Sequence, residues 1–137
     1  MSMPHRLPPT LALLVILAAC GGNGTADTTT TAAIGFPVSG YAHAGPVCPV
    51  EQSPPDPACA DRPVSDALIV VQDRSGGRVA EVRTTAGGTF SVVLPPGEYT
   101  LIPQPVEGLL GTAAAQDVVV ETGPVEGIDF SYDTGIR

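Results

Sequence analysis

Lysine and tryptophan are absent from the sequence, and aromatic residues make up only 4% of it. The absence of lysine excludes chemistry that needs a side-chain amine, such as Schiff-base formation. Because aromatic side chains are so few, we expect a modest core built mainly from valine, leucine and isoleucine. The longest apolar run, residues 11–19, has about nine residues, whereas a membrane-spanning helix needs about 20.

Basic residues are scarce as well. The chain has 6 Lys plus Arg against 14 Asp plus Glu, which gives a formal net charge of -8 at pH 7. Nucleic-acid binding depends on clustered basic side chains. The arginines beyond the N-terminal segment are instead scattered along the chain: Arg62, Arg74, Arg78, Arg83 and Arg137. We therefore expect no nucleic-acid partner.

Groups that support catalysis are also few. A hydrolase needs a nucleophile, a base and an orienting group. His43 is the only histidine outside the N-terminal segment, and no serine lies in a nucleophile-elbow motif. Asp56 and Asp61 could formally act as a catalytic pair of carboxylates, but acidic residues in exposed loops usually serve only to interact with solvent. We expect no enzymatic activity and no cofactor.

The N-terminal segment has the features of an export signal. Residues 1–10 carry a histidine and an arginine but no acidic residue, and the apolar run 11–19 follows. The sequence Leu-Ala-Ala-Cys that ends at Cys20 resembles the bacterial lipobox, in which the cysteine thiol receives diacylglycerol before cleavage at its amino side. The resemblance implies a signal peptide over residues 1–19 and a lipidated first mature residue. An ordinary cleaved signal and an uncleaved anchor remain alternatives.

Residues 20–33 follow as the lipidated cysteine and a linker. The linker lacks large apolar side chains that would order it, so we expect a flexible tether with a mean span of about 20 Å. If the lipobox holds, the protein is anchored outside the cytoplasm in the outer leaflet of the cell membrane, or in the outer membrane of a cell with two membranes. The folded domain is predicted over residues 34–137.

Two cysteines enclose a proline-rich segment within residues 45–64. Export exposes the chain to oxidising conditions, so we predict a disulfide between Cys48 and Cys59. Closing this loop contributes about 2.5 to 3 kcal/mol in the chain-entropy model. A zinc site made by the same cysteines and His43 is an alternative, although the spacing matches no familiar zinc motif. We therefore predict no metal site.

Calcium is a second metal alternative. Asp56, Asp61 and Asp66 offer the oxygen ligands that calcium prefers, but the segment contains no Asp-x-Asp-x-Asp-Gly loop.

Short strands dominate the predicted fold. The 15 prolines and 16 glycines are spread through the chain, which favours many short elements. Alternation of apolar and polar residues predicts seven strands, at 36–43, 67–71, 78–84, 89–94, 98–102, 115–121 and 125–132. This pattern indicates an all-β, seven-stranded Greek-key sandwich of two antiparallel sheets.

Some connections are predicted in detail. Residues 95–98 suit a type II turn, with Pro96 at its second position and Gly97 at its third, so we predict that the strands on either side form a hairpin. Residues 103–114 are predicted to be a long crossover. A register change at Gly40 would turn Tyr41 inward.

Three segments carry a family resemblance: 62–71, 84–90 and 94–101, which together have a Pro-Val, Gly-x-Phe and Leu-Pro-Pro-Gly-x-Tyr pattern. They resemble the carboxypeptidase regulatory-like domain, a prealbumin-like or Cna-B-like sandwich. Asp66 stands where the family usually has glycine, and Thr85 where it usually has aspartate. The resemblance implies a fold rather than a chemistry. Some Cna-B-like domains carry a lysine-derived isopeptide bond, which this lysine-free chain cannot form.

The functional hypothesis is a lipid-anchored binding or scaffolding module of the cell envelope. Its membrane partner is contacted through Cys20, and residues 45–64 and 103–114 are predicted to contact an envelope protein. Within the second segment, Leu109 and Leu110 either close the end of the sandwich or form an exposed recognition spot.

Two further functions remain alternatives. Glycan or cell-wall binding would need exposed aromatic residues, for which the candidates are Phe36, Tyr41 and Tyr132. A purely structural spacer is the other.

Tyr99 is predicted to have a structural role: its ring lies in the core and its hydroxyl donates a hydrogen bond to a loop carbonyl.

Overall fold

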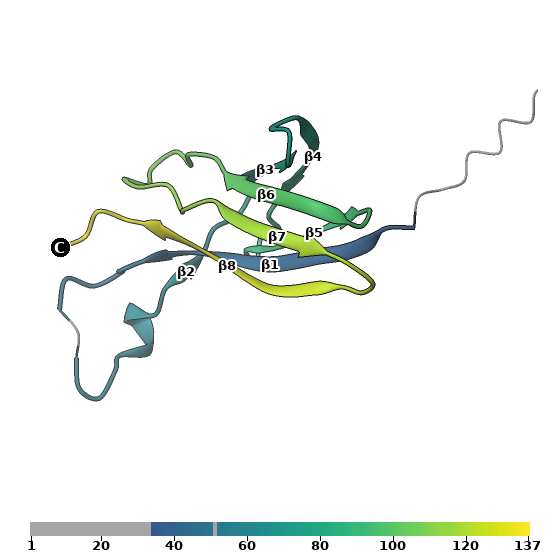
Figure 1. Cartoon of the computed structure of the whole chain (residues 1–137). Helices are drawn as coiled ribbons and strands as arrows, with labels where there is room; N and C mark the ends of the chain where they lie inside the picture. Colours follow the sequence, from purple (N-terminus) through teal and green to yellow (C-terminus); the bar gives the residue numbers. More distant parts are fainter. Residues whose placement is uncertain (1–33, 51) are drawn as a thin grey trace, which may run out of the picture. The chain divides into compact units, whose positions relative to one another are not determined.

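The computed structural model describes residues 34–50 and 52–137. The predictions for the signal peptide, Cys20 and the linker lie outside the described residues. The described chain folds into two β-sheets that pack face to face (Figure 1). The predicted all-β sandwich is confirmed, but the prediction that both sheets are antiparallel is wrong, because the first and last strands of the described chain pair parallel in one of them.

The first sheet contains β1 (Phe36–Gly45), β2 (Arg62–Pro63), β5 (Thr89–Leu94) and β8 (Val125–Asp133). The second has the order β4-β3-β6-β7, with β3 (Leu68–Asp73), β4 (Arg78–Arg83), β6 (Gly97–Pro103) and β7 (Gln116–Val120). A short 3-10 helix, η1 (Pro57–Cys59), lies between β1 and β2. The additional strand relative to the prediction is β2, which has two residues and lies at the end of the proline-rich segment.

Alternating apolar residues of both sheets form a single core. The largest side chains that are fully buried in it are Tyr132, Phe130, Ile69, Leu101, Val38, Val71 and Val120. Phe90 of β5 and Phe130 of β8 stack with their ring centroids 5.6 Å apart. The buried positions on β5, β6, β7 and β8 therefore follow the period-two pattern of the sequence.

β1 organises the first sheet. Its residues 36–41 pair with β5 and its residues 43–44 pair with β2, and both pairings are antiparallel. β8 also pairs with β1, but in the parallel direction. The pairing with β8 shifts register between Val38 and Gly40. A Cβ at Gly40 would overlap the backbone of Ile128, so the close approach of β8 requires glycine there.

The irregularity predicted at Gly40 is therefore present, but its predicted effect on Tyr41 is wrong. Tyr41 is 36% exposed, whereas Ala42 and Ala44 are buried. The extra residue of the bulge lies in β8, so β1 keeps its own alternation and Tyr41 stays on the outer face.

The predicted hairpin over residues 89–102 is wrong. β5 pairs with β1, and β6 pairs with β3 and β7, so the connection between β5 and β6 carries the chain from one sheet to the other. Alternation predicts which face of a strand is buried, but it does not specify the neighbouring strand.

The predicted type II turn is also wrong, because Gly97 does not have a positive φ. Glycine suits this position for a different reason: a Cβ would lie in a tight contact, 3.2 Å from the Tyr99 hydroxyl oxygen. That hydroxyl donates a hydrogen bond of 2.7 Å to the carbonyl of Pro95, and the ring packs against the core. The structural role predicted for Tyr99 is confirmed.

The long connection 103–114 does not cross between sheets. It joins β6 to β7, which are antiparallel neighbours in the second sheet. Gly45 at the end of β1 is followed by the loop 46–61, which projects away from the sandwich, and the C-terminal residues lie at the same end (Figure 1).

Candidate functional site

A groove lies where three segments distant in sequence meet. The loop after β1, the connection 103–114 and the C-terminal residues after β8 line an open hollow of about 460 Å³. Its apolar lining includes Val47, Val64, Val106, Leu109 and Ile136, and its charged lining residues are Arg62 and Glu107. We call it the Arg62 groove.

The floor of the groove is tied to β1. The backbone N–H of Val64 donates to the carbonyl of Ala42 at 2.9 Å, and Val64 is buried. Thr84, which is also buried, donates its hydroxyl proton to the Val64 carbonyl at 2.6 Å and accepts from the N–H of Ala67 at 2.9 Å. These bonds fix the segment between β2 and β3, so the floor is held by the sandwich itself.

The connection 103–114 forms a second wall. Leu109 is half-buried against the core, whereas Leu110 is 74% exposed. The N–H of Leu110 donates to the carbonyl of Asp133 at 2.9 Å, which attaches this connection to the end of β8. The two outcomes predicted for the leucine pair therefore divide between its members: Leu109 covers the core and Leu110 is presented to solvent.

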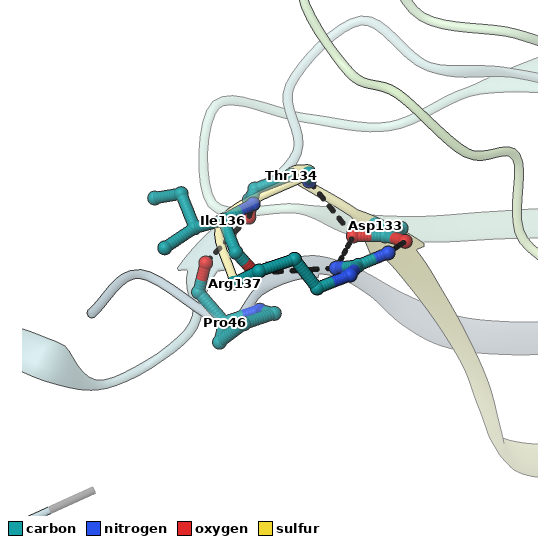
Figure 2. A network of polar contacts seen from close by, with 6 residues as sticks. Pro46, Asp133, Thr134, Ile136 and Arg137 are labelled. Atoms are coloured by element: carbon teal, nitrogen blue, oxygen red, sulfur yellow. Dashed lines mark hydrogen bonds and ion pairs between the residues drawn. The ribbon is translucent and has the colours of Figure 1, made fainter. Parts of the chain in front are cut away.

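The C-terminal residues form a third wall. Figure 2 shows the polar contacts that hold them in place. Thr134 donates its backbone N–H to the Gly45 carbonyl at 3.2 Å and its hydroxyl to the Pro46 carbonyl. Arg137 pairs with Asp133 at 2.8 Å. The hydrogen bond from Arg137, together with the N–H of Gly135, lowers the pKa of Asp133 from its ordinary value of 3.8 to about 2, and the pKa of Arg137 is raised.

The loop that begins after Gly45 is closed at its base. Cys48 and Cys59 form a disulfide with their Cα atoms 5.2 Å apart, so the predicted pairing is confirmed. Within the loop, the carboxylate of Asp56 accepts the N–H of Ala58 at 2.9 Å and caps η1. Val47, next to the disulfide, is thereby held at the groove.

His43 forms a second connection between the loop and the sandwich. Its Nδ1 lies 2.7 Å from the Asp61 carboxylate, its Nε2 lies 3.2 Å from the Asp129 carboxylate, and its ring stacks on Tyr41. A Cβ at Gly45 would overlap the Asp61 carboxylate, so glycine makes room for this contact. The cluster joins β1, the loop and β8.

The metal alternatives are not supported by this geometry. The disulfide occupies both cysteines of the zinc alternative. The carboxylates of the calcium alternative are separated, because Asp56 caps η1, Asp61 contacts His43 and Asp66 pairs with Arg83 at 3.4 Å. Within residues 34–50 and 52–137, no group of three or more metal-ligating side chains is suitably placed.

The aromatic candidates for glycan binding do not share an exposed face. Tyr132 is 1% exposed, and its hydroxyl donates to the Gln104 carbonyl at 3.2 Å. Phe36 is half-buried against the core, which leaves Tyr41 as the exposed member of the set. No row of stacking platforms results.

The sequence located two walls of the Arg62 groove and missed the third. Residues 45–64 and 103–114 were predicted as contact surfaces, but Thr134 and Ile136 were not. No sequence motif marks them, because their place depends on β8 lying beside β1. Among the described residues, no helix is long and apolar enough to cross a membrane.

Comparison with known families and structures agrees with this fold. A sequence model of the carboxypeptidase regulatory-like domain matches residues 56–132, more than half of the chain. No curated protein matches the sequence.

Similar solved structures include the minor pilin of Streptococcus agalactiae, at 12% identity and a TM-score of 0.53. Another is the shaft pilin SpaA of Lactobacillus rhamnosus GG, at 11% identity and a TM-score of 0.54. Each alignment covers 72% of this chain but only 44% and 49% of the two pilin chains, so the chain spans about half the length of these proteins or less. At this level of identity, the comparison shows a shared fold alone.

Proposed function

Because the chain belongs to the carboxypeptidase regulatory-like domain family, we propose that it is a non-catalytic protein-binding module of the cell envelope, held at the membrane by lipid on Cys20. The family is defined by a sandwich fold, and folds of this kind carry their function in loops and surface sites. The Arg62 groove is the surface to which we assign partner binding.

Two features of the sequence and structure support an extracytoplasmic location. The N-terminal segment combines a short apolar run with a lipobox-like Leu-Ala-Ala-Cys ending at Cys20. The disulfide between Cys48 and Cys59 is typical of proteins that fold outside the reducing cytoplasm. Stable anchoring takes two acyl chains or more, which lipidation of an N-terminal cysteine supplies.

The position of the groove is the observation that favours binding over a spacer role. The described chain enters β1 at Phe36, and the groove lies beyond Gly45 at the other end of this strand. The 10 residues of β1 extend about 30 Å at roughly 3.3 Å per residue. A tether that precedes β1 is therefore connected at the end of this strand that lies away from the groove, and we propose that the groove is open to other envelope proteins.

Site-specific photocrosslinking in the native host tests this function. A benzoylphenylalanine residue would replace Glu107, which lines the groove, or Val119, which is 56% exposed on β7. Because both positions are exposed, neither replacement should disturb the core. We expect one defined protein adduct, identified by mass spectrometry, from position 107 and none from position 119.

Other outcomes of this experiment contradict the proposal. Equal adducts from both positions, or none from either while the protein is present in the envelope, would support a structural spacer. A cell-wall sugar in the adduct from position 107 would support the glycan-binding alternative.

A further inference from the structure

The charge of the Arg62 groove identifies what kind of partner it accepts. Four arginines of the described chain pair with carboxylates: Arg74 with Glu98, Arg78 with Glu81, Arg83 with Asp66 and Arg137 with Asp133. Arg62 makes no ion pair with any residue of the described part of the chain.

This arrangement is selective because the chain has no lysine and a formal net charge of -8. An anionic ligand that approaches the other four arginines of the described chain meets guanidinium groups that already pair with neighbouring carboxylates. Arg62 is exposed and stands among the apolar groove walls, where contact with a partner would also remove water. Charge-assisted hydrogen bonds to a guanidinium are stronger than neutral ones, and carboxylates bind it in bidentate geometry.

The walls define the rest of the ligand. Val47, Val106, Leu109 and Ile136 line the hollow with apolar side chains. The volume of about 460 Å³ lies within the usual range for ligand sites, and it suits a few side chains rather than a whole helix or domain face. Because the groove is open, an extended segment can lie along it with both ends in solvent.

Glu107 limits the charge that the ligand carries. Its carboxylate lines the same groove, so an extended polyanion whose further charges reach Glu107 is repelled there, whereas a ligand with a single carboxylate at Arg62 brings no second charge to it. The acidic surface of the whole domain acts in the same direction.

We propose that the Arg62 groove binds a short extended polypeptide segment with apolar side chains and one carboxylate, which pairs with the Arg62 guanidinium. This inference rests on the proposed function and specifies the partner for the same site. The carboxylate belongs either to an acidic side chain or to a free C-terminus.

Fluorescence anisotropy on the purified full chain tests the proposal. The probes are three labelled peptides of alternating valine and leucine: one with a free C-terminal carboxylate, one amidated with an internal glutamate, and one amidated without an acidic group. We expect at least one acidic peptide to bind ten times or more tightly than the neutral peptide. The better of the two acidic peptides identifies the source of the carboxylate.

Arg62→Gln should abolish this tenfold preference, because it removes the charge from an exposed position without a packing defect. Arg74→Gln is the matched control, since Arg74 is exposed and pairs with Glu98 away from the groove. Ile136→Ser should weaken all three peptides, whereas Val119→Ser on β7 should weaken none.

Three results would overturn the inference: equal binding of the acidic and neutral peptides, an unchanged preference in Arg62→Gln, or stronger displacement by dodecanoate than by unlabelled peptide, which would indicate a fatty-acid site. Failure here with a defined protein adduct from position 107 would reject the carboxylate ligand and leave the proposed function standing. Failure in both experiments would reject both.

Discussion

Asp66 adopts a backbone conformation that suits glycine. Its φ is 58°, and it is the one non-glycine residue with positive φ in the part of the chain that the structure describes. The family that the sequence resembles usually has glycine at this position. The N–H of Asp66 donates to the Thr84 carbonyl at 3.0 Å, so the segment between β2 and β3 holds the residue in this conformation.

We predict that Asp66→Gly is more stable than Asp66→Ala by about 1 kcal/mol, since a Cβ in the left-handed region costs about this much. Both variants lose the same ion pair with Arg83, so their difference isolates the backbone term. The free energy of unfolding from urea titrations measures it.

The same pair of substitutions at Asp117 on β7 is the control, and there the order should reverse, because glycine weakens a strand interior. Finding alanine more stable at both positions would contradict the assigned strain.

Asp133 gives the fold a defined dependence on pH. Its folded-state pKa is lowered from 3.8 to about 2 by Arg137 and the Gly135 N–H, so the folded state favours the carboxylate. This stabilisation is complete above about pH 4 and is lost as the pH falls towards about 2. We predict that the free energy of unfolding of Asp133→Asn falls less steeply than that of the wild type over this window.

Asp73 contributes in the same direction, because hydrogen bonds from Ser75 and from the Gly77 N–H lower its pKa. The free energy of unfolding of Asp133→Asn should therefore still fall with pH to some extent. In the double variant that also carries Asp73→Asn, this fall should be smaller. Equal slopes in wild type and Asp133→Asn would show that the Asp133 carboxylate does not contribute to the pH dependence of the free energy of unfolding.

At the scale of elements, the lengths of two connections are opposite to what their roles suggest. The short segment between β5 and β6 crosses between the sheets, and the long segment between β6 and β7 joins neighbours in one sheet. The additional residues of the long connection supply a wall of the Arg62 groove. Its length therefore serves the site rather than the topology.

The loop between β1 and β2 also has an attached part and an exposed part. Its disulfide and the His43 contacts attach its base to the sandwich, while most of its residues are exposed. We predict that replacing Cys48 and Cys59 together by serine lowers the free energy of unfolding by about 2.5 to 3 kcal/mol, because the unfolded chain regains the entropy of an open loop. Urea unfolding of the exported protein measures this change.

Intact mass provides the check on the starting state, since the oxidised wild type is two hydrogens lighter than its reduced form. The serine variant should keep the β-type far-UV spectrum, because no residue of η1 is buried. Free thiols on the exported wild type, or an unchanged stability in the serine variant, would contradict a stabilising crosslink.

For the whole molecule, we assign membrane anchoring and partner binding to different parts of the chain. Cys20 precedes the described residues, and the Arg62 groove lies past the far end of β1. We predict that Cys20→Ser abolishes metabolic labelling with palmitate and leaves the precursor uncut, since the thiol that accepts the lipid is lost.

Cys48→Ser is the matched control, because it removes a cysteine elsewhere and should leave labelling intact. Continued labelling of Cys20→Ser would defeat the anchoring proposal. Loss of labelling in both variants would point to failed export rather than to the lipid site.

The sequence alone determined seven of the strands, their buried faces apart from Tyr41, and the disulfide. Period-two alternation in segments such as 89–94 reflects how side chains project from an extended backbone, which is a local property of the chain. Cys48 and Cys59 flank one loop, so their pairing also needed no knowledge of the fold.

Only the tertiary structure decided which strands are neighbours and where the groove lies. The side chains of β5 have the same alternation whether β6 or β1 pairs with it, since pairing uses backbone groups that every residue except proline carries. Ile136 reaches Val47 and Leu109 in one groove because the last strand lies parallel to the first. The selectivity that we propose for Arg62 likewise depends on the tertiary structure, which pairs the other described arginines with carboxylates.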